Sequence, residues 1–367
     1  MVHAVIDISI VLIAIFLIGL LVLVHELGHL FVAKRSGVRV LGFSVGFGRK
    51  LLAWRWGETE YSLSAIPLGG YVKMAGEQHS EQSSQPGDYL SKPIGTRALI
   101  VFAGPFVNYV MAIVSLWLMF VTGYPSRLPV VGQVVEDTPA QVAGLQPGDR
   151  IQAINGRPIP TWEEMTKIIY ASPNQPLAFL IQREQTTQTV TITPKPKPGK
   201  DLFGRPKTIG LIGIVPGREI HIYRVGPLAA IGRTIQLQNE FIVQNFFGLW
   251  LVVTGQVSMR ETMGGPIAIV YMTTEAVRDG LASTLSFIGV VSLCLSVFNL
   301  FPIPILDGGH LLFLAIEKLR GRPVSVNVQE RSAQVSLVLL SMLVLIVCIN
   351  DVNRFGLLEK VIGWVHR

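Results

Sequence analysis

The chain has 367 residues, of which 50% are hydrophobic and only 15% are charged. Soluble domains carry about a quarter charged residues, so this composition excludes an ordinary soluble globular protein and indicates an integral membrane protein. The formal net charge of +7 points first to basic loops on the cytoplasmic side of a membrane. The sequence has no glycine-rich phosphate loop and no interleaving of basic and aromatic residues, so we expect no nucleic-acid partner.

The first predicted element is a membrane helix over residues 7–33, which is long enough because a bilayer span takes about 20 apolar residues. It is too long for the core of a signal peptide, and no small-residue cleavage site precedes His25, so we expect it to be retained. His25 and His29 are four residues apart on one helix face and can reach the same metal ion. Glu26 lies beside the first histidine, where it can take a proton from an attacking water molecule.

Two histidines on an apolar helix face can also serve packing or hydrogen bonding between helices. That alternative has to explain His25, Glu26 and His29 together at depth in a membrane segment, where ionisable groups are costly to bury and are functional by default. We therefore predict a catalytic metal site. Such a site takes three protein ligands and an open position. Residues 30–33 offer no third ligand, so it must come from elsewhere in the chain.

The loop that follows predicts β structure over residues 38–76. Apolar and polar residues alternate in 38–48 and in 59–74, and Gly69-Gly70 offers a turn. We expect a small antiparallel sheet or hairpin that dips toward the membrane. A second span follows over 97–122 and contains a proline, which kinks a helix.

Residues 129–215 predict a compact soluble module with mixed α and β structure. We expect strands at 130–135, 150–156, 177–184, 186–194 and 208–215, helices at 139–145 and 161–171, and a loop at 194–206. Residues 226–275 then carry too many polar side chains for a lipid-facing span. We expect an amphipathic helical segment there, lying on the membrane or against the helix bundle.

The third span, 281–306, ends in a stretch interrupted by prolines, so it is not helical throughout. Asp307 follows this stretch and is the best candidate for the third metal ligand, since the two glycines after it allow a close approach to another helix. Two alternatives stay open: Asp307 caps the next helix, or His310 binds the metal in its place. A fourth span covers 333–350, and residues 351–367 form a tail.

The distribution of basic residues predicts the orientation in the membrane. Lysines and arginines gather between the first two spans and between the last two, so both loops are expected in the cytoplasm and the module 129–215 on the opposite side. Cys294 and Cys348 both lie in apolar runs. Two such cysteines give no disulfide framework and no zinc-finger spacing, so we expect them to be packing residues.

Taken together, the motifs resemble those of the bacterial site-2 proteases, the family of regulated intramembrane zinc metalloproteases. The resemblance covers essentially the whole chain and lies in three patterns: HExxH at 25–29, GPxxN at 104–108 and NxxPxPxLDGG at 299–309. It implies an α-helical polytopic membrane protein with about four transmembrane helices, a small membrane-associated β-hairpin and one inserted α+β PDZ domain. The relatives that cleave anti-sigma factors carry two PDZ modules in tandem, whereas this chain shows one.

The resemblance also implies roles for single residues. His25, His29 and Asp307 are then the ligands of a Zn²⁺ ion, and Glu26 is the general base. Asn299 is expected to bind the substrate backbone, because an amide can pair with both N–H and C=O groups.

The remaining substrate-binding candidates are less specific. By resemblance Asn108 has a role near the active site, although taken alone it could merely bond to a neighbouring helix. The segment with Gly69, Gly70 and Tyr71 resembles a hairpin that receives the substrate as an added strand. The alternative for that segment is an ordinary hairpin.

The sequence thus predicts a zinc metalloendopeptidase of the bacterial cytoplasmic (inner) membrane. We expect it to cleave transmembrane segments of single-pass membrane proteins, either regulators similar to anti-sigma factors or signal-peptide remnants, in regulated intramembrane proteolysis. The PDZ domain either binds a peptide or trimmed substrate end or filters substrates by size, and the sequence does not choose between them. Two other classes compete: a metal transporter, which usually offers several ligand sets along a path, and an inactive scaffold, which does not need Glu26.

Overall fold

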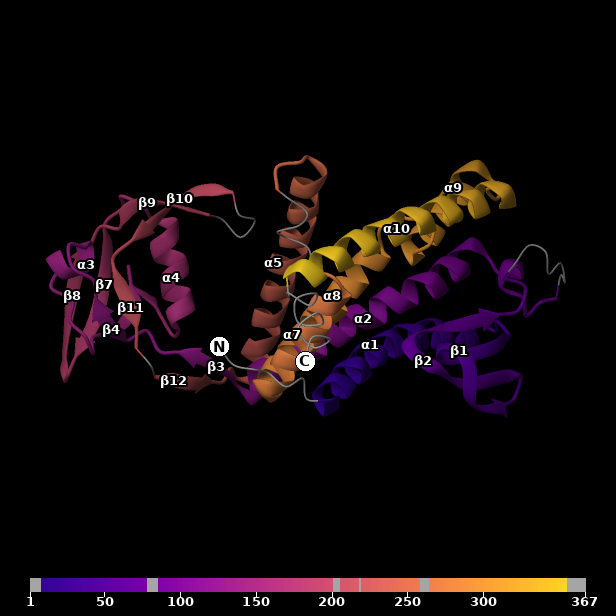
Figure 1. The fold of residues 1–367 in the computed structure, drawn as a ribbon, viewed down its shortest axis with the longest axis horizontal. Helices are drawn as coiled ribbons and strands as arrows, with labels where there is room; N and C mark the ends of the chain where they lie inside the picture. The colour runs from indigo at the N-terminus through magenta and orange to yellow at the C-terminus, as the bar shows by residue number, and fades with distance from the viewer. Residues whose placement is uncertain (1–7, 78–84, 201–204, 218, 258–263, 355–367) are drawn as a thin grey trace, which may run out of the picture. The chain divides into compact units, whose positions relative to one another are not determined.

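The computed structural model describes residues 8–77, 85–200, 205–217, 219–257 and 264–354 (Figure 1). It confirms the four expected spans, since four helices are long and apolar enough to cross a membrane: α1 (Ile8–Arg35), α2 (Ile94–Thr122), α8 (Leu281–Asn299) and α10 (Val326–Arg354). Helix α10 is longer at both ends than the expected 333–350. Most of the predicted tail, residues 355–367, lies outside the described residues.

The chain divides into two compact units, and the first contains the four long helices apart from the end of α2. Within it α1 contacts α7 (Pro266–Arg278) and α8, and α7 also contacts α8 and α10. Gly289 of α8 packs directly against Leu116 of α2, because a Cβ at this position would lie 2.6 Å from the leucine side chain. Many apolar side chains of α10 are exposed, among them Leu339 and Leu345, as expected for a helix that faces lipid.

The polar segment after the PDZ region forms α5 (Pro227–Val253). Its polar Thr234 and Gln238 are fully buried, whereas Leu228, Val243 and Trp250 are exposed. This distribution is the reverse of that on a helix in water, where the apolar stripe faces the core. Gln236 and Asn239 are exposed as well, so the outer surface of α5 carries both apolar and polar side chains.

Strands β1 (Val40–Trp56) and β2 (Thr59–Met74) form the predicted sheet. The chain reverses at residues 57–58 and again between Leu63 and Gly70, because 60–63 pair with 42–45 in the same direction whereas 70–73 pair with them in the opposite direction. Gly69 and Gly70 lie at the end of this second reversal, as expected, although both fall within the range of β2. Each strand pairs in two places. Val40 and Val45 lie opposite Met74 and Gly70, while the later part of β1 pairs with the beginning of β2. Gly69 has a φ of +117°, a backbone conformation that glycine adopts readily, and lies between these two pairings of β2.

The sheet is fixed to the membrane helices next to the metal-binding motif. One cluster of buried side chains joins Leu30 of α1, Phe43 of β1, Met74 of β2 and Ile100 of α2. Both strands contact α1 (Figure 1). The hydrophobic contacts of this cluster thus hold the end of β2 beside the His-Glu-x-x-His turn.

The second unit holds the predicted module. Its helices are α3 (Pro139–Val142) and α4 (Trp162–Ala171), and its strands are β4 (Val131–Val134), β5 (Arg150–Ile154), β6 (Arg157–Pro158), β7 (Leu177–Arg183), β8 (Thr186–Ile192), β9 (Lys195–Lys200), β10 (Pro206–Leu211) and β11 (Ile214–Pro216). A four-stranded sheet has the order β6-β5-β7-β8, while β4 pairs with β11 and β9 with β10. The loop expected at 194–206 is therefore wrong in part, because 195–200 form β9. Two short strands, β3 (Tyr124–Arg127) and β12 (Ile220–Tyr223), pair with each other.

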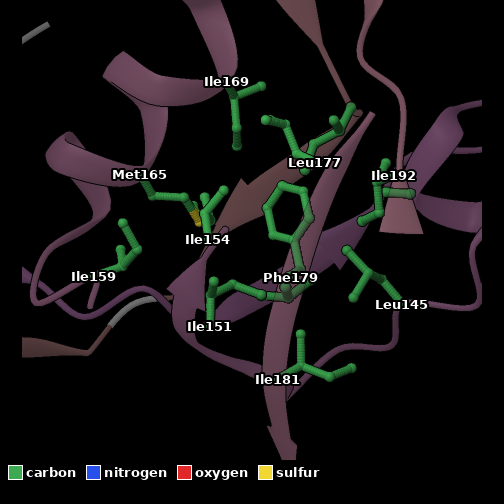
Figure 2. Close-up of a cluster of buried hydrophobic side chains, with 13 residues drawn as sticks. Leu145, Ile151, Ile154, Ile159, Met165, Ile169, Leu177, Phe179, Ile181 and Ile192 are labelled. Carbon is green, nitrogen blue, oxygen red and sulfur yellow. The ribbon is translucent and has the colours of Figure 1, made fainter. Parts of the chain in front are cut away.

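The module has a core of its own, shown in Figure 2. Leu177, Phe179 and Ile181 alternate along β7 and are all buried, as side chains on one face of a strand should be. They pack with Ile151 of β5 and Met165 of α4. The sequence expectation of an inserted α+β domain is confirmed.

Candidate metal centre

Helix α1 brings His25 and His29 together. They lie one turn apart and are 8% and 9% exposed, and their Nε2 atoms are 3.1 Å from each other. The carboxylate of Asp307 completes the cluster: Oδ2 lies 3.1 Å from Nε2 of His25, and Oδ1 lies 3.6 Å from Nε2 of His29. His25 and Asp307 are 282 positions apart in the sequence but lie next to each other in the fold.

Asp307 is the first residue of α9 (Asp307–Arg320) and points its carboxylate toward α1. The alternative in which it caps α9 does not hold, because the N-cap residue is Leu306 and no side-chain cap bond is formed. The two glycines that follow explain the tight geometry. A Cβ on Gly309 would lie 2.5 Å from Cα of Pro304, and a Cβ on Gly308 would collide with the backbone of Leu300. Only glycine lets the proline-containing turn fold back onto the start of α9.

The three donor atoms fit a small tetrahedral ion. With bonds of 2.0–2.1 Å, neighbouring ligand atoms around a zinc ion are about 3.3 Å apart, close to the separations between His25, His29 and Asp307. Two imidazoles with one carboxylate are also a common ligand set for catalytic zinc. His310 lines the same cavity but does not belong to the cluster of potential ligands found among the described residues.

Helix α2 packs against the cluster, and the turn of α2 that contains GPFVN (104–108) contacts it. Nδ1 of His29 lies 2.8 Å from the carbonyl oxygen of Ile100. The amide nitrogen of Asn108 lies 3.3 Å from Nδ1 of His25. The amide oxygen of Asn108 is buried and has no hydrogen-bond partner within the described ranges. A buried polar atom without a partner is rare and calls for an explanation.

Glu26 lies between the metal cluster and the sheet. The backbone N–H of Val72 in β2 is directed at its carboxylate. A Cβ at Gly70 would lie 3.3 Å from Cγ of Glu26 and 2.7 Å from the carbonyl oxygen of Ser44, so only glycine fits there. Strand β2 therefore holds the carboxylate of Glu26 next to the histidines.

A cavity of about 440 Å³ opens onto these groups. Four of the five substrate-binding candidates line it: Asn108, Asn299, Gly70 and Tyr71. Gly69 is not among its lining residues and packs instead against the ring of Phe47.

The cavity also has a polar end that the sequence does not reveal. Arg97 of α2 and Glu317 of α9 form a bidentate ion pair there, with N–O distances of 3.2 and 2.5 Å. Tyr89 lies nearby, and burial raises the pKa of its hydroxyl group. These residues carry no recognisable motif, and only the packing of α2 against α9 brings them together. The metal cluster is therefore linked to a partly polar cavity between the membrane helices and β2, which can supply the water that hydrolysis needs.

Comparison with known families decides the class of the protein. The profile described as Peptidase family M50 matches residues 13–343, which is nearly the whole chain and includes every residue of the metal cluster. The chain belongs to peptidase family M50. The resemblance to site-2 proteases seen in the sequence is thereby confirmed, and the chain is an enzyme that hydrolyses peptide bonds.

Its relatives in this family come from several bacteria. A protein of Rhizobium meliloti is 35% identical over 356 residues, which are 92% of this chain and 95% of the relative. The zinc metalloprotease RasP of Oceanobacillus iheyensis is 31% identical, covering 94% and 98%. The regulator of sigma-E protease RseP of Escherichia coli is 30% identical, covering 92% and 97%. The RseP alignment runs over 443 positions, more than the 367 residues of this chain, so RseP contains inserted sequence that this M50 peptidase lacks.

Among solved structures, the PDZ domain of an SdrC-like protein from Listeria monocytogenes aligns with 24% of this chain and 84% of its own length, at 23% identity and a TM-score of 0.19. The PDZ domain of an SdrC-like protein from Listeria innocua covers 26% and 99%, at 25% identity and a TM-score of 0.20.

Proposed function

We propose that this M50 peptidase is an intramembrane zinc endopeptidase in which His25, His29 and Asp307 hold the ion and Glu26 transfers the proton. The observation that carries the proposal is the meeting of three metal-ligating side chains with a carboxylate beside them, inside a bundle of apolar helices. Two relatives that match over almost their entire length support this function, since RasP is named a zinc metalloprotease and RseP a protease. The cytoplasmic membrane of a bacterium is the proposed location.

The chemistry follows from the residues around the cluster. When bound, zinc supplies Lewis acidity and makes a water molecule nucleophilic at neutral pH. Glu26 accepts the proton that this water loses and then donates it to the nitrogen of the departing amine. Its carboxylate is held by the Val72 amide in β2, so it needs little reorientation during the reaction.

The substrate that fits this site is an extended peptide segment. A transmembrane helix hides its peptide bonds within its own hydrogen bonds, so it has to be unwound before hydrolysis. The part of β2 with Gly70 and Tyr71 lines the cavity, and an edge strand can hold an unwound peptide by strand addition. Asn299, at the end of α8, offers an amide that can pair with the same peptide backbone.

The proposed orientation follows the charge distribution. The loops with residues 34–96 and 307–332 are placed in the cytoplasm and the PDZ domain on the opposite side. The proposed substrates are single-pass membrane proteins, such as regulators similar to anti-sigma factors or signal-peptide remnants. The PDZ domain is proposed to limit access by size or by binding a trimmed substrate end.

A chelator experiment tests the assignment. The purified protein is mixed with a model transmembrane peptide, treated with a zinc chelator and then supplied again with Zn²⁺. We expect cleavage to stop and to return, with cuts inside the apolar segment. A metal transporter would bind zinc without cleaving the peptide, and an inactive scaffold would cleave at no metal concentration.

A further inference from the structure

We propose that the GPFVN turn of α2 is a support for the metal site, and that Asn108 is the positioning residue that fixes His25 in its metal-binding form. The inference rests on the zinc site of the proposed function and goes beyond it, because it assigns Asn108 to the ligands and not to the substrate. The geometry that carries it is the contact of α2 with both histidines, through Ile100 to His29 and through Asn108 to His25.

A histidine ligand has a defined requirement at its second nitrogen. A neutral imidazole carries one proton, so a ring that binds a metal through Nε2 keeps that proton on Nδ1 and is a hydrogen-bond donor there. An acceptor next to Nδ1 fixes both the tautomer and the ring orientation. In this protein Nε2 of each histidine faces Asp307, and Nδ1 of each faces α2.

His29 has its acceptor in the backbone. Its Nδ1 donates to the carbonyl oxygen of Ile100 over 2.8 Å. This carbonyl lies next to that of Val101, which is four residues before Pro105. Proline has no N–H to donate and its ring displaces the carbonyl four residues earlier, so it opens the hydrogen-bond ladder of α2 at this turn. Pro105 thus leaves the carbonyl of Val101 without its helical N–H partner, one residue after the carbonyl of Ile100 that accepts from His29.

Among the described residues, the hydrogen-bonding group next to Nδ1 of His25 is a side chain. The amide group of Asn108 is fully buried against this nitrogen, and its oxygen is the atom left without a partner among the described residues. Rotating the amide exchanges the oxygen and the nitrogen and turns the acceptor toward Nδ1 of His25. This rotation supplies what a metal-bound His25 requires, and it gives the buried amide oxygen its partner.

Gly104 allows this arrangement. A Cβ at this position would lie 2.7 Å from Nε2 of His25 and closer still to Nε2 of His29. Gly28 of α1 has the matching role on the other helix, because its Cβ would lie 2.5 Å from the carbonyl oxygen of Ala103. Glycine at both positions brings α1 and α2 near enough for Asn108 to reach His25.

The test measures zinc affinity separately from cleavage. Three variants of the full chain, Asn108→Leu, Asn108→Ala and Asn108→Asp, are titrated with Zn²⁺ against a chelator. Leucine has the same branched shape as asparagine but is bulkier and has no acceptor. Alanine removes the acceptor without adding bulk, and aspartate keeps an acceptor. We expect the leucine and alanine variants to bind zinc 10- to 100-fold more weakly, the range for loss of such a partner, and the aspartate variant to bind like the wild type. Substitution of Co²⁺ gives a second readout, since its visible absorption bands should change only in the two variants without an acceptor.

The control is Asn299→Leu, which removes another amide from the same cavity and should leave zinc affinity unchanged. Thermal unfolding of the metal-free proteins identifies any variant that fails to fold. If the leucine variant does not fold, the alanine variant alone tests the loss of the acceptor. The inference is overturned if both variants without an acceptor bind zinc like the wild type and lose only substrate affinity. If the wild type itself takes up no zinc, the proposed function fails as well, so the two failures are distinguishable.

Discussion

Replacing Gly104 by alanine should weaken zinc binding in a protein that otherwise stays folded. The added methyl carbon would lie 2.7 Å from Nε2 of His25, roughly 0.7 Å short of the 3.4 Å at which ordinary van der Waals contact begins, and its approach to His29 is closer still. The atoms in conflict are the two ring nitrogens that face Asp307. Neither can move away along a flexible side chain, because Ile100 and Asn108 hold the opposite side of each ring.

The size of the effect follows from these distances. Ligand distances in a working metal site lie within about 0.2 Å of their ordinary values, so a displacement of about 0.7 Å is too large to be absorbed. We expect zinc affinity to fall at least 10- to 100-fold, which is about 1.4–2.7 kcal/mol. Overpacking costs a further 1–3 kcal/mol or so of folding stability. Alanine is the better helix former by about 1 kcal/mol and offsets part of that loss.

The assay is a chelator titration of the purified protein, followed by thermal unfolding with and without Zn²⁺. Gly95→Ala is the matched control, since it makes the same change in the same helix at a position where a Cβ has no neighbour within 4 Å. It should bind zinc like the wild type. Wild-type zinc affinity in the Gly104→Ala protein would show that α2 does not approach the ligands as closely as described.

Three further predictions concern the parts of the molecule around the site. Arg97 and Glu317 form a largely buried ion pair, so Arg97→Leu, which leaves Glu317 unpaired, should cost about 3–5 kcal/mol of stability in thermal unfolding. Replacing both residues by Leu should cost less; equal losses would mean that the pair is solvated. The buried carboxylate of Asp351 accepts hydrogen bonds from the backbone N–H groups of Gly265 and Ala268 at the start of α7. Asp351→Ala should therefore lower folding stability by about 1–2 kcal/mol and leave the zinc content unchanged; an unchanged unfolding temperature would contradict this role. A protein without residues 129–215 should still bind zinc, cleave a bulky untrimmed membrane substrate faster and cleave a short model peptide at nearly the same rate. If this protein were folded and zinc-loaded but no longer cleaved the short peptide, the PDZ domain would be part of the catalytic machinery.

The parts of the fold that the sequence predicts are those fixed by local pattern. The four spans follow from long apolar runs. The strands of the PDZ domain follow from apolar residues at every second position, and its helices from apolar residues at helical spacing. Asp307 could be found because a carboxylate directly after a proline-broken helix, followed by two glycines, has few structural reasons to be there. The reversal that ends at Gly69-Gly70 could be predicted because adjacent glycines favour a turn, whereas the pairing of residues 42–45 with two separate stretches of β2 has no signature in the sequence.

The remaining features depend on which helices pack together. Arg97 and Glu317 are 220 positions apart, and neither belongs to a motif. Asn108 was recognisable as part of GPxxN, but its contact with His25 appears only when α2 is placed against α1. The same holds for Ile100, whose backbone carbonyl has no signature in the sequence at all. The residues that support the proposed ligands are thus found only in the structure, whereas the proposed ligands themselves can be named from the sequence.

The central claim is tested most directly by Glu26→Gln, which keeps the size of the side chain and removes its ability to accept a proton. Zinc content and cleavage of a model transmembrane peptide are measured on the same preparation, beside the wild type. We expect about one zinc ion per chain in both proteins, as one three-ligand site allows, and a rate in the variant that is lower by at least the 10²–10⁴-fold range typical of general-base removal. A fully zinc-loaded variant that cleaves the peptide near the wild-type rate would contradict the assignment of Glu26 and, with it, the proposed mechanism.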